Sequence, residues 1–402
     1  MINDRLNVFV VITDCLRYDA FQGMEIKKYG KVIENVYSSA PSTFFAVPSI
    51  LTGTLPFQVI KDARINSEAY TYLPLVAWKY GYQTLFVTGN VVTSRAYGYY
   101  IKEGIFEDFL KIRKLPPSDL GLQKEGKVRK VVRNILKRYP RIFYIAKITY
   151  HLLKKDLKNQ NTAFENKIRT GVIIDYLSKQ KFLSEKPIFG FIHLMDTHAP
   201  YGSPHLRKQD LKKAARLVRK LYGHPTLLKE KEIELLKYFY QTEVEYLDDA
   251  LEELLNLIDK KFNLKQSVVI VVSDHGEAFG EGGYFTHPDF GLIKEILKVP
   301  LVMFGNVGGI KVVGQGILPS WKIHEIVLKI FSGQKEITVE REKEALAIGY
   351  KREDKKYKIV KYARIANDKI VVQEDLETIN RLLIEKRREY MLNKLRRKLS
   401  KQ

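Results

Sequence analysis

Two residues that can bind a metal ion, Asp274 and His275, stand side by side one residue after a run of apolar, β-branched residues at 268–272. That run has the length and composition of a buried strand. Open α/β sheets bind ligands beyond the carboxyl ends of their strands. A carboxylate and an imidazole placed there can both ligate a divalent cation. A simple strand-to-helix turn with Asp274 as its cap is the alternative interpretation.

Two other apolar runs also end in residues capable of chemistry. Residues 6–12 precede Asp14, and residues 187–194 precede Asp196 and His198. Because each run is short, apolar and β-branched, we expect two more buried strands whose carboxyl ends carry these groups. The sequence therefore predicts that one edge of a sheet collects several carboxylates and imidazoles.

Hydroxyl residues are concentrated at 38–56, where Ser42 and Thr43 precede a short apolar segment. A helix beginning there would offer its free amide groups to an anion, although such residues are often only caps. The full candidate set joins carboxylates, imidazoles and one hydroxyl: Asp14, Thr43, Asp196, His198, Asp274, His275 and His287. Such a set suits divalent ions that activate an alkoxide and polarise an anionic ester.

The elements that must position these groups follow the alternation of an α/β fold. A helical pattern at 72–80 precedes a strand pattern at 83–88, and an acidic amphipathic helix at 243–257 leads into the strand at 268–272. Another strand is expected at 299–304. The predicted fold class is α/β, with a mostly parallel central sheet flanked by helices on both faces.

The predicted domain organisation has three parts. Residues 1–110 and 161–335 form one catalytic α/β domain, interrupted by a basic helical insertion at 111–160. Residues 336–402 form a C-terminal α+β segment that ends in a long basic helix at 376–399.

Net charge is +22 over 402 residues, and 18 of these charges fall in segments 111–160 and 385–402. These basic segments suit an anionic membrane surface or a polyanion, while a solvated helix face is the alternative. No nucleic-acid-binding motif is present, so no specific nucleic acid is expected. The single cysteine, Cys15, excludes an internal disulfide. Neither a signal peptide nor a membrane span is recognisable, which predicts a cytoplasmic protein, and the basic segments would allow a peripheral association with the membrane.

The segments that carry the candidate residues occur in a fixed order between Val8 and Phe304. They read VFVVITDCLRYDAF, APSTFFAVPSILTGTLP, FIHLMDTHAPY, EVEYLDDALEELL, VVIVVSDHGEAFGEGG and THPDFGLIKEILKVPLVMF. Together they resemble the sulfatase-like branch of the alkaline phosphatase superfamily, over about three quarters of the chain.

This resemblance implies a role for each candidate residue. It implies that Asp14, Asp274 and His275 hold one or two divalent metal ions, chosen among Mn, Zn, Mg and Ca. It places Thr43 at the nucleophile position, with His198 and His287 contacting the transferred anion or protonating the leaving group. In two-metal relatives Asp196 could instead bind a second ion together with His287.

The chain departs from the sulfatase pattern at the nucleophile. Sulfatases carry cysteine or serine there, because that residue is oxidised to formylglycine, and Thr43 cannot form this aldehyde. The resemblance therefore implies a metal-dependent hydrolase or transferase acting on phosphate esters, with Thr43 as a metal-activated nucleophile and Ser42 as the second choice. The alternatives are a sulfatase that works without formylglycine and an inactive sulfatase-like protein that binds membranes or polyanions.

Three further residues near these motifs have simpler interpretations. His193 lies inside the apolar run at 187–194 and is interpreted as a core histidine. Cys15 is interpreted as a small packed residue beside Asp14. Glu277 could either support a metal ligand or cap a helix.

Overall fold

The computed structural model describes most of the chain apart from one long internal segment. The described residues are 5–61, 64–65, 72–90, 167–182, 185–353 and 356–399. The predicted basic insertion at 111–160 lies outside these residues.

A six-stranded sheet forms the centre of the molecule, with the order β2-β11-β8-β1-β7-β6. Its strands are β1 (Asn7–Thr13), β2 (Lys31–Val32), β6 (Gln83–Thr88), β7 (Ile188–Leu194), β8 (Ser267–Ser273) and β11 (Leu301–Gly305). Strands β6, β7, β1 and β8 are parallel, whereas β11 runs antiparallel to β8 and β2 antiparallel to β11. The predicted mostly parallel sheet is thus confirmed, with β11 as the strand that runs in the opposite direction.

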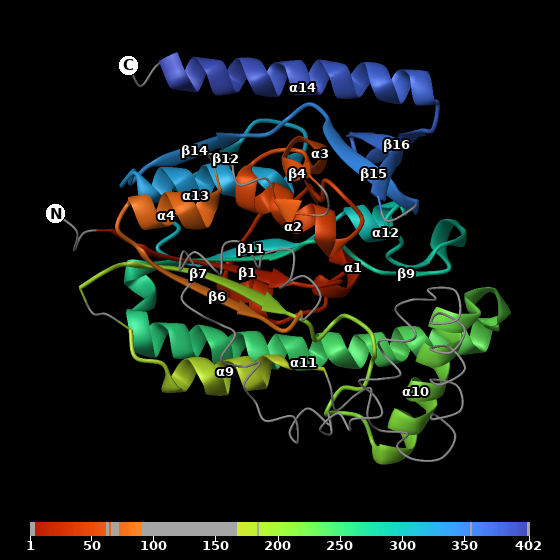
Figure 1. Cartoon of the computed structure of the whole chain (residues 1–402). Helices are drawn as coiled ribbons and strands as arrows, with labels where there is room; N and C mark the ends of the chain where they lie inside the picture. Colours follow the sequence, from red (N-terminus) through yellow and green to blue (C-terminus); the bar gives the residue numbers. More distant parts are fainter. Residues whose placement is uncertain are drawn as a thin grey trace, which may run out of the picture.

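Helices cover both faces of this sheet, as predicted. In Figure 1, α9 and α11 lie below the sheet, while α2, α4 and α13 lie above it. The bounds of the helices that precede the C-terminal segment are α1 (Tyr18–Phe21), α2 (Thr43–Thr52), α3 (Pro56–Val59), α4 (Leu73–Lys79), α9 (Thr170–Lys179), α10 (Lys208–Gly223), α11 (Glu230–Phe262), α12 (Lys294–Leu297) and α13 (Ile323–Phe331).

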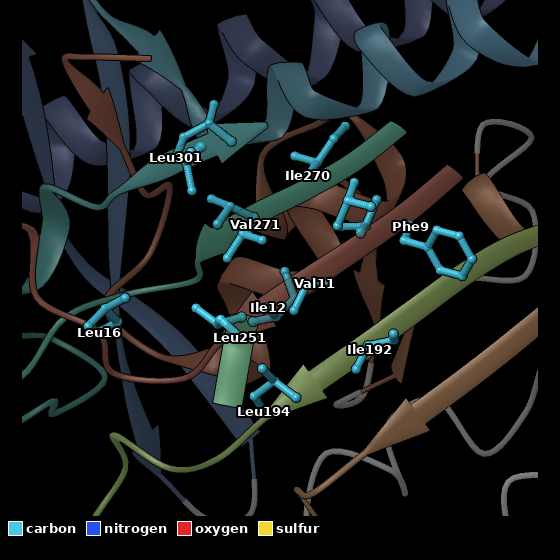
Figure 2. Close-up of a cluster of buried hydrophobic side chains, with 14 of the residues drawn as sticks. Phe9, Val11, Ile12, Leu16, Ile192, Leu194, Leu251, Ile270, Val271 and Leu301 are labelled. Carbon is cyan, nitrogen blue, oxygen red and sulfur yellow. The ribbon is translucent and has the colours of Figure 1, made fainter. Parts of the chain in front are cut away.

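Strand β1 is the most enclosed part of the core. Its residues Val8, Val10, Val11 and Ile12 have no solvent exposure, because neighbouring strands lie on both sides and helices cover both faces. Figure 2 shows side chains from β1, β7, β8 and β11 gathered with Leu251 of α11. Full burial of each such side chain stabilises the fold by roughly 1.5–3 kcal/mol. The strand that leads to Asp14 is therefore held firmly.

The C-terminal segment adds a second, smaller sheet. Strands β15 (Ala345–Glu353), β16 (Lys356–Ala366) and β17 (Lys369–Gln373) pair antiparallel, and α14 (Leu376–Leu399) packs on β16. Before them, β14 (Ile337–Glu340) pairs in parallel with β12 (Ile310–Val313). The boundary predicted at residue 336 therefore falls between two paired strands.

Aromatic stacking joins this small sheet to α2. The rings of Phe45 and Tyr350 stack at 3.7 Å and 4°, and those of Phe44 and Tyr357 stack at 5.4 Å. Since α2 begins with Thr43, the C-terminal sheet packs against the helix that carries the candidate nucleophile.

Two predicted helices have different bounds in the structure. The pattern at 318–331 predicts one helix, but α13 begins only at Ile323, because β13 (Leu318–Pro319) pairs with β3 (Val36–Tyr37). The acidic helix predicted at 243–257 is part of the much longer α11. The remaining strands are short pairs, β4 (Ile60–Lys61) with β5 (Arg64–Ile65) and β9 (Ala278–Phe279) with β10 (Phe285–Thr286).

None of the helices within the described ranges is long and apolar enough to cross a lipid bilayer.

Candidate active site

Asp14 and Asp274 are brought together by the pairing of β1 with β8. The last pair in this register joins Thr13 to Ser273, so the two aspartates follow neighbouring strands at the same edge of the sheet. Both side chains are completely buried. Two buried carboxylates at the ends of neighbouring strands repel each other, and a cation between them would offset this repulsion.

Polar groups from several other parts of the chain surround the Asp14 carboxylate. Its Oδ2 atom lies 3.0 Å from Nε2 of His193 and accepts hydrogen bonds from Asn90 Nδ2 at 3.2 Å and Thr43 Oγ1 at 3.1 Å. Burial opposes ionisation, but the imidazoles of His198, His193 and His275 hold the pKa of Asp14 well below its usual range. Asp14 is therefore an anion at neutral pH.

His275 presents one ring nitrogen to this cluster. Its Nδ1 lies 2.9 Å from the carbonyl oxygen of Gly276, which fixes the proton on Nδ1. Its Nε2 is then a lone-pair donor, and it lies 3.1 Å from Thr43 Oγ1, 3.5 Å from Asp274 Oδ2 and 3.7 Å from Asp14 Oδ1. Such an orientation suits a metal-binding histidine.

Gly276 allows this arrangement by a close backbone approach. A Cβ atom on Gly276 would lie 2.0 Å from the carbonyl oxygen of Glu295. The Gly276 amide instead donates a hydrogen bond of 2.7 Å to the Ile296 carbonyl. The glycine after His275 therefore lets the chain turn against α12 without moving the imidazole.

A divalent cation fits the ligand atoms of Asp14, Asp274 and His275. One ligand atom from each lies within 4.8 Å of the other two. Asp274 Oδ2 is buried and, in the part of the chain that the structure describes, has no hydrogen-bond partner. Burial together with the Asp14 charge raises the pKa of Asp274, a cost that a cation would offset. Two carboxylates and one imidazole form the oxygen- and nitrogen-donor set that such ions prefer.

Thr43 is the first residue of α2, and its hydroxyl points into the cluster. The hydroxyl contacts Asp14 and His275, as given above, at the helix end where the macrodipole favours anions. The neighbouring Ser42 is engaged elsewhere, because its Oγ donates a hydrogen bond of 2.6 Å to Asp289. Of these two hydroxyls, that of Thr43 contacts the cluster and that of Ser42 does not.

His198 and His287 add two more imidazoles to the cluster. Their ring centroids are 5.1 Å apart, and the His287 ring lies 4.5 Å from that of His275. Burial would lower the pKa of His287, but Glu277, whose Oε1 lies 3.1 Å from Nδ1, raises it to about 9. Burial lowers the pKa of His198. At neutral pH the pair thus offers one protonated and one neutral imidazole.

Glu277 supports His287 rather than capping a helix. It is fully buried, and its second oxygen, Oε2, accepts a hydrogen bond of 3.1 Å from the hydroxyl of Tyr201. Burial would raise the pKa of Glu277, but His287 and other imidazoles lower it. Glu277 is therefore an anion that orients and charges His287.

Asp196 does not join the cluster, which corrects the prediction that it binds a metal ion. Its Oδ1 and Oδ2 both lie 3.3 Å from the Thr170 amide, and the Thr170 hydroxyl also donates to Oδ2. Arg169 lies 3.8 Å away. Although Asp196 follows β7 as predicted, its side chain turns toward α9 and is already paired there.

Three residues of the cluster lack a functional interpretation in the sequence. His193 contacts Asp14, so it is not merely a core histidine, and Cys15 Sγ lies 3.2 Å from Asp14 Oδ1 and 3.4 Å from His287 Nδ1. Asn90 follows β6 just as Asp14 follows β1. The strand-end pattern could have found Asn90, and the imidazole in an apolar run could have found His193.

Comparisons with known proteins identify a family and a fold. The chain matches the Sulfatase family model over residues 7–313. No curated protein sequence matches it.

Solved structures with the same fold include three proteins of 12–15% identity. One is a protein of Bacteroides thetaiotaomicron, solved in work on the metabolism of multiple glycosaminoglycans (14% identity, 93% of this chain and 90% of that chain, TM-score 0.56). Another is the phosphonate monoester hydrolase of Agrobacterium radiobacter (12% identity, 92% and 89%, TM-score 0.53). The third is the soluble domain of lipooligosaccharide phosphoethanolamine transferase A from Neisseria meningitidis (15% identity, 81% and 88%, TM-score 0.50).

Proposed function

The chain belongs to the sulfatase family, within the alkaline phosphatase superfamily, and on that basis we propose that it is a metal-dependent hydrolase or transferase of phosphate esters. Thr43 is the proposed nucleophile. One observation carries this proposal: the Thr43 hydroxyl lies 3.1 Å both from Asp14 Oδ2 and from His275 Nε2. A threonine cannot be converted to the formylglycine of sulfatases, whereas its alkoxide can attack phosphorus directly.

The metal is proposed to bind to Asp14, Asp274 and His275. When bound, a divalent ion lowers the pKa of a neighbouring hydroxyl and offsets negative charge on an ester. The protein's own groups prepare Thr43 for the same step, since its hydroxyl donates a hydrogen bond to Asp14 Oδ2, which can take up the proton. His193 and Asn90 hold the Asp14 carboxylate in place.

The proposed reaction has two displacements at phosphorus. In the first, Thr43 Oγ1 forms a bond to phosphorus and the bond to the leaving oxygen breaks, which gives a phosphothreonine and an alcohol once that oxygen takes a proton. In the second, water or an acceptor alcohol attacks the phosphothreonine and releases Thr43. The choice of acceptor separates a hydrolase from a transferase.

His287 and His198 are proposed to serve the leaving oxygen and the transferred group. His287, kept protonated by Glu277, can give a proton or balance the anion's charge. The His198 ring lies 5.1 Å from the His287 ring. Because its Nδ1–H donates to the Ala199 carbonyl, the neutral ring presents the Nε2 lone pair, which can accept a hydrogen bond from a protonated oxygen of the transferred group or from the attacking water or alcohol. Thr43 also begins α2, and the amino terminus of a helix favours an anionic ester.

A panel of paired esters tests the choice of phosphorus over sulfur. With Mn²⁺, Zn²⁺ or Mg²⁺ present, 4-nitrophenyl phosphate or bis(4-nitrophenyl) phosphate is expected to be turned over with a kcat/KM at least about 100-fold above that of 4-nitrophenyl sulfate. This difference is expected because the threonine alkoxide needs no aldehyde chemistry. The measurement is initial rate by nitrophenolate absorbance, with chelator-treated protein as the blank.

The same panel distinguishes the alternatives. Faster turnover of the sulfate ester would replace the proposal with a sulfatase that works without formylglycine. Loss of all turnover with every metal and with added alcohols as acceptors, in folded protein, would favour a binding role.

The C-terminal helix α14 supports a peripheral association with an anionic membrane. Ile379 and Leu382 of this helix are buried against the small sheet, whereas Ile384, Met391 and Leu392 are 69%, 54% and 46% exposed. Since successive residues turn by about 100°, Ile384 and Met391 lie on the face opposite Leu382. The bare face also carries Arg388 and Arg381, the latter paired with Glu377.

Exposed aliphatic side chains can enter the surface of an anionic bilayer while neighbouring arginines contact the lipid phosphates. Nucleic acid would use the arginines but not the exposed aliphatic residues. A second copy of the chain would place like charges together. An anionic membrane is therefore the proposed partner of this face of α14, the helix that Figure 1 shows along the top of the molecule.

Vesicle sedimentation tests this association. Binding to vesicles containing phosphatidylglycerol is expected at low salt, with little binding to pure phosphatidylcholine and loss of binding near 0.5 M salt. Replacing Ile384, Met391 and Leu392 together by glutamine should weaken binding at least about tenfold. The control is Leu227→Gln, an equally exposed leucine elsewhere. Unchanged binding of the triple variant would reject α14 as the membrane contact.

A further inference from the structure

Four charged side chains are buried together beside the active site but contact none of its proposed metal ligands. Glu243 of α11 and Asp196 are fully buried, and the side chains of Lys167 and Arg169 are 4% and 15% exposed. A buried charge costs several kcal/mol unless it is paired and hydrogen-bonded. The two positive and two negative side chains pair with each other here, so the net charge of the cluster is zero.

Glu243 is the centre of this group. Its carboxylate oxygens accept hydrogen bonds from Lys167 Nζ at 3.1 Å, Arg169 Nη1 at 2.8 Å and the Gly202 amide at 2.6 Å. The position of both cations therefore depends on one carboxylate, presented by a long helix that packs on the sheet.

The two cations bind the backbone of the loop that follows β7. Lys167 Nζ donates to the carbonyl oxygens of Asp196 and, at 3.1 Å, of Pro200, and Arg169 Nη2 donates to the carbonyl of Gly202. Residue 198 lies between these anchored points. The loop is therefore held on both sides of His198 by groups that never touch its imidazole.

His198 depends on the loop for its orientation. Its Nδ1 lies 2.6 Å from the carbonyl oxygen of Ala199, so the ring presents its other nitrogen to the cluster. A ligand atom of His198 lies within 4.8 Å of atoms of Asp14 and Cys15. Even a displacement of about 1 Å at such a site can cost roughly 100-fold in rate.

We infer that Lys167, Arg169 and Glu243 form a positioning network for His198 in the proposed reaction. They are positioning residues, because they act on the loop backbone and not on the substrate. This inference rests on the proposed function, since it assumes that His198 contacts the transferred group or the leaving oxygen. It also explains why charged residues are buried where apolar residues of similar volume would be equally stable.

Kinetics of Glu243→Gln test the network. The amide keeps the size of the side chain but leaves Lys167 and Arg169 without their shared anion. We expect kcat on phosphate esters to fall about 10- to 100-fold, with KM changed by less than about threefold. Glu245→Gln, exposed two residues further along α11, is the matched control and should leave both constants unchanged. Arg169→Lys is the second variant, for use if Glu243→Gln does not fold. It keeps the charge but loses the forked contacts, and we expect it to lower kcat by a smaller factor.

A double-mutant cycle separates positioning from general destabilisation. Glu243→Gln is expected to lower kcat at least about tenfold in the wild-type background but less than about twofold in the His198→Gln background. Equal losses in both backgrounds would overturn the inference and leave the network a purely structural role. Full activity of His198→Gln itself would instead reject the role of His198 in the proposed function. If Glu243→Gln and Arg169→Lys both keep the wild-type kcat while His198→Gln lowers it, the network is rejected and the role of His198 is kept.

Discussion

Replacing Thr43 by alanine is expected to lower kcat on phosphate esters by at least about 10³-fold, because no other described hydroxyl lies within hydrogen-bond distance of both Asp14 and His275. The buried Thr43 side chain is small, so the variant should fold. In wild-type protein quenched during turnover, mass spectrometry of the peptide containing Thr43 should detect a mass increase of one phosphoryl group. The alanine variant should show no such increase.

Two variants at this helix start serve as controls. Thr43→Ser keeps the hydroxyl and should retain activity within about tenfold of wild type. Ser42→Ala removes only the hydrogen bond to Asp289 and should cost far less than Thr43→Ala. Full metal-dependent activity of Thr43→Ala would exclude Thr43 as the nucleophile, and a phosphoryl group on Ser42 would identify the second choice.

The second large effect concerns the metal. Asp274→Asn is expected to abolish tight metal binding, as measured by metal analysis after dialysis, and to lower kcat/KM at least about 10³-fold. In wild-type protein, metal at 100 times its Kd should stabilise the fold by about 2.7 kcal/mol, visible as a rise in Tm. This rise should vanish in Asp274→Asn.

The stability of the metal-free proteins tests whether Asp274 serves the metal or the fold. Chelated Asp274→Asn should be at least as stable as chelated wild type, because the substitution removes one of two buried, mutually repelling carboxyls. Asp175→Asn, an exposed carboxylate on α9, is the control and should bind metal normally. A metal-free variant far less stable than metal-free wild type would mean that Asp274 is a structural residue. Normal metal content in Asp274→Asn would also reject the assignment.

Strand ends are the feature that makes this site predictable from sequence. Short apolar runs end directly before Asp14 and before Asp274 and His275, and parallel strands bring such ends to one edge. The fold class follows from the same alternation, and the observed sheet confirms it. The start of a helix at Thr43 also follows from local composition, because hydroxyl residues precede an apolar segment there.

Asp196 and His193 show where this reasoning stops. Both are near the end of β7, and the strand-end rule selects Asp196, whereas the structure turns its carboxylate to Thr170 and places His193 against Asp14. The loop after β7 decides which side chain at the strand end faces the cluster. Lys167 and Glu243, which are distant in sequence, hold that loop. Periodicity carries no information on such contacts. The predicted basic insertion remains a prediction.

The central position of β1 also has a consequence for how the protein is made. Val8 pairs with Phe189 on one side and Val268 on the other, so the first strand synthesised waits for partners about 180 and 260 residues later. At translation rates of about 5–20 residues per second, that wait lasts roughly 13 to 50 s before β8 emerges. Throughout it, an apolar strand with two free edges is open to wrong pairing. Asp14 and Asp274 become neighbours only after about two thirds of the chain has left the ribosome, so the proposed metal site forms late in synthesis.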